Sequence, residues 1–138
     1  MNNIILLVAR VLLSFMFIMS GAMKFGDIGQ TAGMITQAGL PAATALAWLA
    51  AIFEVVAGLA ILIGFQTRIA AYLLAAFCVF TAFMFHGGPI AIPDFPEGAN
   101  AMLSLFNQIM MMKNLTIAGG FLALSVAGPG AWSIDARR

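Results

Sequence analysis

The stretch ATALAWLAAIFEVVAGLAILIGF occupies residues 43–65 and carries a single charge, Glu54. About 20 consecutive apolar residues in a helix are enough to cross the hydrocarbon core of a bilayer. The stretch therefore predicts a transmembrane helix with a carboxylate near its middle. A charge in hydrocarbon is costly and is tolerated mainly where it faces a protein interior, a partner or water, so Glu54 also marks a candidate functional position.

The composition of the whole chain agrees with a membrane location. The chain has 138 residues, of which 63% are hydrophobic and 8% are charged, and its mean hydropathy is +1.06. Soluble domains carry roughly 25% charged residues, so a water-soluble fold is excluded. The net charge of +1 gives no reason to expect nucleic acid as a partner.

Three further apolar stretches, at about residues 4–25, 69–85 and 109–127, predict three more spans. The first is expected to be a retained helix rather than a signal peptide, because Arg10 interrupts it and no basic residue precedes it. The connectors 26–41 and 86–108 mix polar and apolar residues at helical spacing, which predicts segments at the membrane surface. We therefore expect one domain over residues 1–138, an all-α membrane protein that forms an antiparallel four-transmembrane-helix bundle with interfacial segments in two extracytoplasmic connectors.

The distribution of basic residues predicts the orientation of this bundle. An even number of spans places both termini on one side, and that side also holds the turn at residues 66–68. Its charges are Arg10, Arg68, Arg137 and Arg138 against Asp135. Because basic residues favour the cytoplasm, both termini are predicted to be cytoplasmic, in a multi-pass protein of the bacterial inner membrane.

Helical spacing predicts which face of each span points inward. Small residues allow close helix contact in lipid, and polar side chains bond across such contacts. The expected inward stripes combine both kinds of residue: Arg10, Ser14, Phe17, Gly21 and Lys24; Ala47, Ala50, Ala51, Glu54, Ala57, Gly58 and Ile61; Arg68, Tyr72, Ala75, Val79, Ala82 and His86; Lys113, Thr116, Gly120 and Ala123.

These stripes bring cations towards Glu54. From the rise of 1.5 Å per residue, Glu54 lies near the midplane and Arg10 lies roughly 10 Å in from the cytoplasmic end. Lys24 and His86 stand at the opposite end of their spans, with Lys113 about one turn inside. Glu54 is expected to pair with one or more of these cations, and the sequence does not decide between Arg10 and the lysines.

Two interpretations of this cluster remain open. An ion pair inside a bundle can serve only to fix the packing of the helices, with Lys24 extending to the interface and His86 acting as a polar loop residue. Alternatively, cations outnumber Glu54, and surplus positive charge favours an anion or the oxygens of a quinone-like ring. Apolar side chains for such a pocket are expected from Phe15, Phe17, Trp48, Phe53, Phe83, Met84 and Phe85.

The residues that carry these inferences also resemble the DoxX family of small bacterial membrane proteins. The matching segments are Arg10–Leu13 followed by Ser20–Phe25, Glu54 with Gly58, Gly64–Arg68, and Lys113-Asn114-Leu115 with Gly119-Gly120. The resemblance implies a four-helix membrane protein. In some relatives such a protein is the membrane subunit of a thiosulfate:quinone oxidoreductase, and others are oxidoreductases linked to quinone or thiol stress.

The chain itself supplies few redox groups. Cys78 is its only cysteine and His86 its only histidine, so it has no CxxC motif and no pair of haem-ligating histidines. No metal site, dinucleotide fingerprint or intrinsic cofactor is predicted. Any electron-carrying centre is expected on a partner protein or on a bound quinone.

Three functions follow, and the sequence leaves all of them open. The first is a quinone-interacting oxidoreductase, or the membrane subunit of one, that takes a small anion such as thiosulfate or a reactive phenol. The second is a non-catalytic scaffold that docks a redox partner through residues 132–138 and 86–108. The third is a small-solute carrier, for which four short spans offer little. A homo-oligomer is compatible with each. The predicted polar site comprises Arg10, Lys24, Glu54, His86, Lys113 and Asn114.

Overall fold

The computed structural model describes residues 2–137, and every regular element in that range is a helix. The elements are α1 (Asn2–Gly26), α2 (Ile28–Gln37), α3 (Ala43–Ile63), α4 (Thr67–His86), α5 (Glu97–Ala127) and a short 3-10 helix, η1 (Asp135–Arg137). Helices α1, α3, α4 and α5 are each long and apolar enough to cross a membrane. The predicted all-α fold with four spans is thus confirmed. The location of α2 and of the 87–96 connector at the membrane surface stays a prediction.

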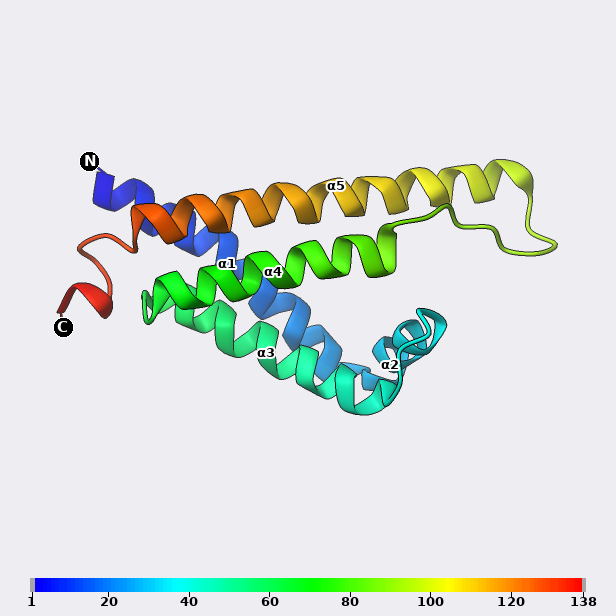
Figure 1. Ribbon diagram of the computed structural model, residues 1–138, viewed down its shortest axis with the longest axis horizontal. Coiled ribbons are helices and arrows are strands. Elements are labelled where there is room, and N and C mark those ends of the chain that lie inside the picture. Colours follow the sequence, from blue (N-terminus) through cyan, green and yellow to red (C-terminus); the bar gives the residue numbers. More distant parts are fainter. Residues whose placement is uncertain (1, 138) are drawn as a thin grey trace.

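The four long helices form two antiparallel pairs, α1 with α3 and α4 with α5 (Figure 1). The pairs meet near the end of the molecule that holds both termini and diverge towards the opposite end (Figure 1). Where they meet, the rings of Phe17 and Phe121 pack edge to face with their centroids 5.4 Å apart. Ile61 and Leu74 are fully buried in the same core. The bundle is therefore closed at the end with the termini and open at the other.

Glycines allow the close packing of α1 on α3. A Cβ at Gly21 would lie 2.7 Å from Val55 Cγ2 and 2.8 Å from the Ala51 carbonyl oxygen, and one at Gly58 would lie 2.9 Å from Ile18 Cγ1. Atoms at such distances overlap, so only glycine permits this separation. Close approach through small residues is the usual way in which membrane helices associate.

Arg10 binds the C-terminal segment to the bundle at its closed end. Its side chain is only 2% exposed, and its guanidinium donates three hydrogen bonds to backbone oxygens. Nη1 donates to Pro129 O at 2.7 Å and to Trp132 O at 2.9 Å, and Nη2 donates to Leu62 O at 2.8 Å. The planar guanidinium, with several donors in a fixed geometry, suits this arrangement. Arg10 therefore joins α1, the end of α3 and the C-terminal segment.

Asp135 holds the same C-terminal segment against the start of α4. Its carboxylate accepts hydrogen bonds from the backbone N–H groups of Gln66 and Thr67, at 2.8 and 2.9 Å, and from the Thr67 hydroxyl at 2.9 Å. A carboxylate at a helix N-terminus satisfies free N–H groups and interacts favourably with the helix dipole. The α3–α4 turn approaches this segment so closely that a Cβ at Gly64, whose φ is +69°, would collide with Ser133 Cβ.

The predicted inward stripes are right for α1 and α3 and only partly right for α4 and α5. In α1 the buried residues are Arg10, Ser14, Phe17 and Gly21, and in α3 the predicted set is buried apart from half-buried Ala50. In α4, however, Arg68, Tyr72 and Val79 are exposed. The predicted Ala75 and Ala82 are buried, together with Thr67, Ala70, Ala71, Leu74 and Cys78, which were not predicted. In α5, Thr116 and Ala123 are exposed, and Ala118, Phe121, Leu124 and Ser125 are buried.

Helix α5 begins much earlier than expected, at Glu97 rather than near residue 109. Its 31 residues give a length of roughly 45 Å at 1.5 Å per residue, against about 30 Å for the hydrocarbon core. Its first part extends beyond the end of α4 (Figure 1). Much of the connector 86–108, predicted as a surface segment, therefore belongs to this continuous helix, and its residues Met102, Leu105 and Phe106 are exposed.

The packing at Gly58 can be tested by a change of volume. Gly58→Leu should lower the melting temperature of the protein in detergent by several degrees, because overpacking a tight contact costs about 1–3 kcal/mol. Gly119→Leu is the matched control, since a Cβ there meets no atom within 4 Å. Equal melting temperatures for the two variants would contradict the described α1–α3 contact.

The role of Arg10 can be tested by Arg10→Lys, which retains the charge but not the planar group with its several donors. We expect the C-terminal segment to detach, so that backbone amides of residues 129–136 exchange hydrogen faster and carboxypeptidase trims the chain. Arg68→Lys, at an exposed arginine of the same end, is the control. Unchanged exchange in the Arg10 variant would show that the three hydrogen bonds do not hold this segment.

Candidate functional site

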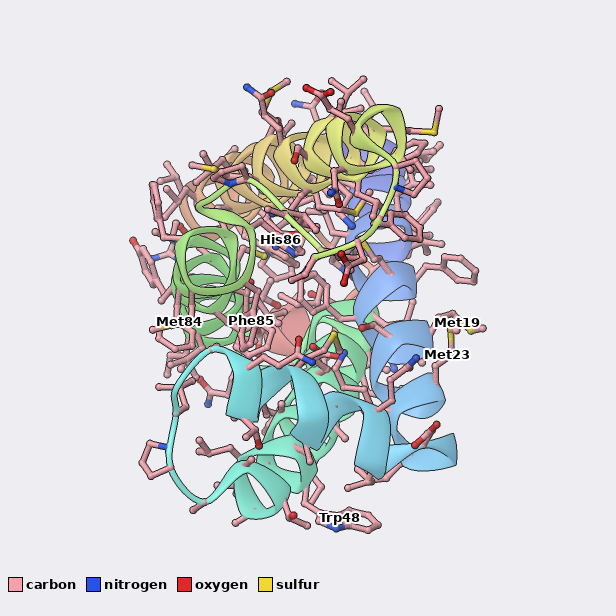
Figure 2. All side chains as sticks on the ribbon, turned by 90° about the vertical axis from the view of Figure 1, so that its right-hand side faces the viewer. Met19, Met23, Trp48, Met84, Phe85 and His86 are labelled. Atoms are coloured by element: carbon pink, nitrogen blue, oxygen red, sulfur yellow. The ribbon has the colours of Figure 1, made fainter. Side chains whose placement is uncertain are left out.

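A cavity of about 770 Å³ lies between the two helix pairs. Figure 2 looks into the bundle from its open end and shows His86 and Phe85 directed between the helices, whereas Met19, Met23, Trp48 and Met84 point outward. All five α-helices contribute to the wall. Its apolar lining is formed by Met16, Phe17, Met34, Ile35, Leu40, Leu46, Leu49, Ala50, Phe53, Leu73, Phe77, Cys78, Phe80 and Phe85.

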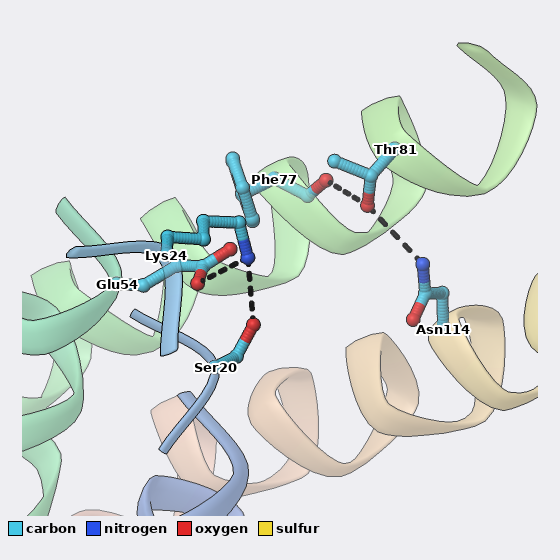
Figure 3. A network of polar contacts seen from close by, with 6 residues as sticks. All are labelled: Ser20, Lys24, Glu54, Phe77, Thr81 and Asn114. Atoms are coloured by element: carbon cyan, nitrogen blue, oxygen red, sulfur yellow. Dashed lines mark hydrogen bonds and ion pairs between the residues drawn. The ribbon is translucent and has the colours of Figure 1, made fainter. Parts of the chain in front are cut away.

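An ion pair between α1 and α3 forms one polar part of the wall (Figure 3). Lys24 Nζ lies 2.9 Å from Glu54 Oε2 and also donates to Ser20 Oγ at 2.7 Å. Glu54 is 4% exposed, and Lys24 is half-buried. The sequence left the counter-ion of Glu54 open between Arg10 and the lysines, and the structure assigns it to Lys24. The pair neutralises both charges at this side of the cavity.

Lys113 forms a second polar part of the wall, on α5. Its ammonium donates to Met110 Sδ at 3.2 Å, and it has no carboxylate partner among residues 2–137. A thioether is only a weak acceptor, so most of the hydrogen-bonding capacity of the ammonium is unused. Because Lys24 and Glu54 cancel, Lys113 gives the cavity a net positive charge.

Asn114, which follows Lys113 in the sequence, connects α5 to Thr81 on α4 (Figure 3). The Thr81 hydroxyl donates to Phe77 O at 2.9 Å, and Asn114 Nδ2 donates to Thr81 Oγ1 at 3.2 Å. The Asn114 carbonyl oxygen Oδ1 has no hydrogen-bond partner in the described part of the chain. It adds an accessible acceptor to a wall that is otherwise mostly apolar.

His86 lies at the C-terminal end of α4, where the cavity opens. Its Nδ1 is 2.6 Å from Asn107 Oδ1, on the part of α5 that extends beyond α4. The ring is half-buried. His86 lines the cavity, and its hydrogen bond to Asn107, which does not line the cavity, holds the ring in place.

Most of the predicted site residues come together here. Lys24, Glu54, His86, Lys113 and Asn114 all line the cavity, whereas Arg10 lies at the closed end on backbone carbonyls. Of the apolar residues expected around the site, Phe17, Phe53 and Phe85 line it. The others, Phe15, Trp48, Phe83 and Met84, are exposed on the outside of the bundle, which corrects that expectation.

Helix α2 closes one side of the cavity and was not assigned to the site from the sequence. Thr31 and Ile35 are its buried residues, one helical turn apart, and both line the cavity. That i, i+4 spacing was a usable signal, because it marks one face of a helix. Ser20 was also missed as a ligand of Lys24, although it stands one turn before it in α1.

The fold and the site together define an integral membrane protein with four spans and a polar cavity between them. Comparison with known proteins agrees with that class: a model of the DoxX family matches residues 5–87. The chain belongs to the DoxX family, as its sequence motifs indicated.

Curated relatives of similar length match nearly the whole chain. The chain is 40% identical to the inner membrane protein YqjF of Escherichia coli K12, over 98% of this chain and 92% of the relative. It is 34% identical to the inner membrane protein YphA of the same organism, over 97% and 90%. It is 30% identical to the uncharacterized membrane protein Rv3486 of Mycobacterium tuberculosis H37Rv, over 93% and 77%. No solved structure matches the chain. The protein is thus a multi-pass protein of the inner membrane.

The ion pair can be tested by a double-mutant cycle. Lys24→Met should destabilise the protein by up to about 3 kcal/mol, because it leaves a buried carboxylate without its cation. Glu54→Leu should also destabilise it, and the double variant should lose less stability than the sum of the two single changes. Thermal or denaturant unfolding in detergent gives the three values. Additive losses would mean that the two side chains do not interact.

Proposed function

We propose that this protein binds a quinone-like ring in the cavity and acts as a quinone-interacting oxidoreductase or as the membrane subunit of one. The proposal is carried by Lys113, a cation without a carboxylate partner in residues 2–137, on the wall of a largely apolar cavity. An ammonium in such surroundings favours an oxygen that carries partial or full negative charge. The carbonyl oxygens of a quinone and the phenolate oxygen of its reduced form are acceptors of this kind.

The size and lining of the cavity support the same ligand. Small-molecule sites measure about 300–1,000 Å³, with mostly apolar walls and a few polar groups that orient the ligand. The cavity of about 770 Å³ falls within this range and offers Phe17, Phe53, Phe77 and Phe85 as ring contacts. A quinone carries its two oxygens on an otherwise apolar ring, which corresponds to Lys113 and Asn114 within an aromatic wall.

Electron transfer in this proposal depends on a donor outside the chain. Cys78 is the only cysteine, so a dithiol step within one chain is not available. The chain would hold the quinone and orient it, and a partner protein or a small donor such as an anion or a phenol would supply the electrons.

We also propose that both termini lie in the cytoplasm. The closed end of the bundle carries the basic residues Arg68 and Arg137, and basic residues favour the cytoplasmic side. The open end of the cavity would then be nearer to the extracytoplasmic side.

The docking alternative has less support. Residues 129–135 are bound by Arg10 and by the start of α4, and the 87–92 connector is bound to α5, so both candidate contact segments are already engaged within the chain. No observation favours a carrier role, because the carboxylate of Glu54 is already paired with Lys24.

Binding of a short-chain benzoquinone tests the proposal directly. Lys113→Met should weaken binding by about tenfold, because a charged hydrogen bond contributes roughly 1.5 kcal/mol or more. The measurement is quenching of the intrinsic tryptophan fluorescence, or calorimetric titration, with protein in lipid nanodiscs. Arg68→Gln, which removes an exposed cation at the far end, should leave the affinity unchanged. Quinone that does not bind the unaltered protein, or binds the Lys113 variant equally well, would refute the proposal.

A further inference from the structure

The amide group of Asn107 has only one orientation that satisfies its neighbours. Its Nδ2 lies 2.9 Å from Gly88 O, and its Oδ1 lies 2.6 Å from His86 Nδ1. A backbone carbonyl accepts hydrogen bonds and cannot donate them, so the amide nitrogen must face Gly88. The amide oxygen therefore faces the ring of His86.

That orientation fixes the position of the proton on neutral His86. An amide oxygen is an acceptor, so the hydrogen bond at 2.6 Å requires a proton on Nδ1. In a neutral imidazole the other nitrogen, Nε2, is then unprotonated and carries a free lone pair. Nε2 has no hydrogen-bond partner within residues 2–137, and His86 lines both this cavity and a second hollow of about 460 Å³ beside Gly87–Pro89. A ligand that reaches the free edge of this ring from the cavity would therefore meet a proton acceptor.

The segment that carries Gly88 is itself held against α5 by four further hydrogen bonds. Ser104 Oγ accepts from Ile90 N and donates to Ile90 O, at 3.0 and 3.1 Å. The Asn100 side chain makes the same two contacts with the backbone of Ile92, at 3.0 and 3.1 Å. Asn100, Ser104 and Asn107 follow one face of α5 and pair with every second residue of the connector, namely Ile92, Ile90 and Gly88. Asn107 is accordingly a positioning residue that acts through His86.

A second acceptor on the cavity wall follows from the same reasoning. The Thr81 hydroxyl donates its one proton to Phe77 O, so its oxygen can only accept a hydrogen bond from Asn114. The amide nitrogen of Asn114 must therefore face Thr81. This leaves Asn114 Oδ1 as a free acceptor beside Lys113. The cavity therefore presents two acceptors, His86 Nε2 and Asn114 Oδ1, and one charged donor.

We propose that the cavity selects rings that carry hydroxyl groups, such as a hydroquinone or a catechol, over the corresponding dione. This inference rests on the proposed quinone-binding function and specifies that the reduced, hydroxyl-bearing form of the ligand is preferred. A dione has only acceptors and leaves His86 Nε2 and Asn114 Oδ1 unpaired, whereas a dihydroxy ring donates to one or both and still accepts from Lys113. A ligand without a donor leaves these two acceptors unpaired when it binds, which costs free energy, and the site therefore binds that ligand more weakly.

The proton on His86 can be observed without any ligand. His86 is the only histidine of the chain, so nitrogen-15 NMR of histidine-labelled protein, purified without a histidine tag, reports on this ring alone. At mildly alkaline pH we expect the signature of the Nδ1–H tautomer. Asn107→Asp, which keeps an acceptor at the same place, should retain it, and Asn107→Leu should lose it. An Nε2–H tautomer in the unaltered protein would overturn the inference even if quinone binds.

Selectivity is measured as the ratio of two affinities. A short-chain benzohydroquinone, kept reduced under argon, should bind at least about fivefold more tightly than the matching benzoquinone, since one net hydrogen bond accounts for roughly that factor. The ratio should fall towards one in His86→Phe and in Asn107→Leu, and it should persist in Asn107→Asp.

Asn100→Leu is the control for a merely structural effect, because it breaks the same series of contacts at its far end without touching His86. It should leave the ratio unchanged. Equal affinities for the two forms in the unaltered protein would refute the selectivity while the proposed function stands. Absence of binding for both forms would refute the proposed function together with this inference.

Discussion

The carboxylate of Glu54 sits inside an apolar bundle, and its need for a cation constrains much of the structure around it. Lys24 meets that need from the neighbouring helix, at 2.9 Å. The contact requires α1 and α3 to pack closely, which Gly21 and Gly58 permit. Because Lys24 is paired with Glu54, Lys113 is the only lysine or arginine on the cavity wall, within the described residues, that has no carboxylate partner. The carboxylate that joins two helices thus also determines which cation on the cavity wall is left without a carboxylate partner among the described residues.

The sequence predicted the inward face correctly where a buried charge lay in the middle of a helix. Arg10 and Glu54 each determine the rotation of their helix, because a charge can face only the interior. In α4 the polar residues Arg68 and His86 lie at the ends, where water or loops can reach them, so they constrain rotation weakly. Lipid is as apolar as the core, and side chains such as Tyr72 and Val79 are therefore stable on either face. Periodicity alone could not separate the two faces of α4.

The hydrogen-bond partners of Arg10 and His86 could not be predicted from local sequence patterns, for a different reason. Arg10 binds backbone carbonyls of a segment more than 100 residues away in the chain, and carbonyls carry no sequence signature. His86 is paired with Asn107 because α5 begins at Glu97 and extends alongside the connector. The sequence divided that helix into a surface segment and a span. The missing information was in each case how the chain folds back, not which residues are polar.

The two ends of the bundle differ in a way that bears on how the cavity can work. At the closed end, Arg10 and Asp135 join α1, α3, α4 and the C-terminal segment through hydrogen bonds to backbone groups. At the open end the pairs separate, and the contacts of Lys24, Asn107 and Asn114 each join elements of one pair only. Because Arg10 and Asp135 join elements of both pairs and the contacts at the open end do not, separating the two pairs costs less free energy at the open end. The proposed ligand would therefore enter between the pairs at the open end, where His86 lines the cavity, while the hydrogen bonds of Arg10 and Asp135 hold the helices together at the closed end.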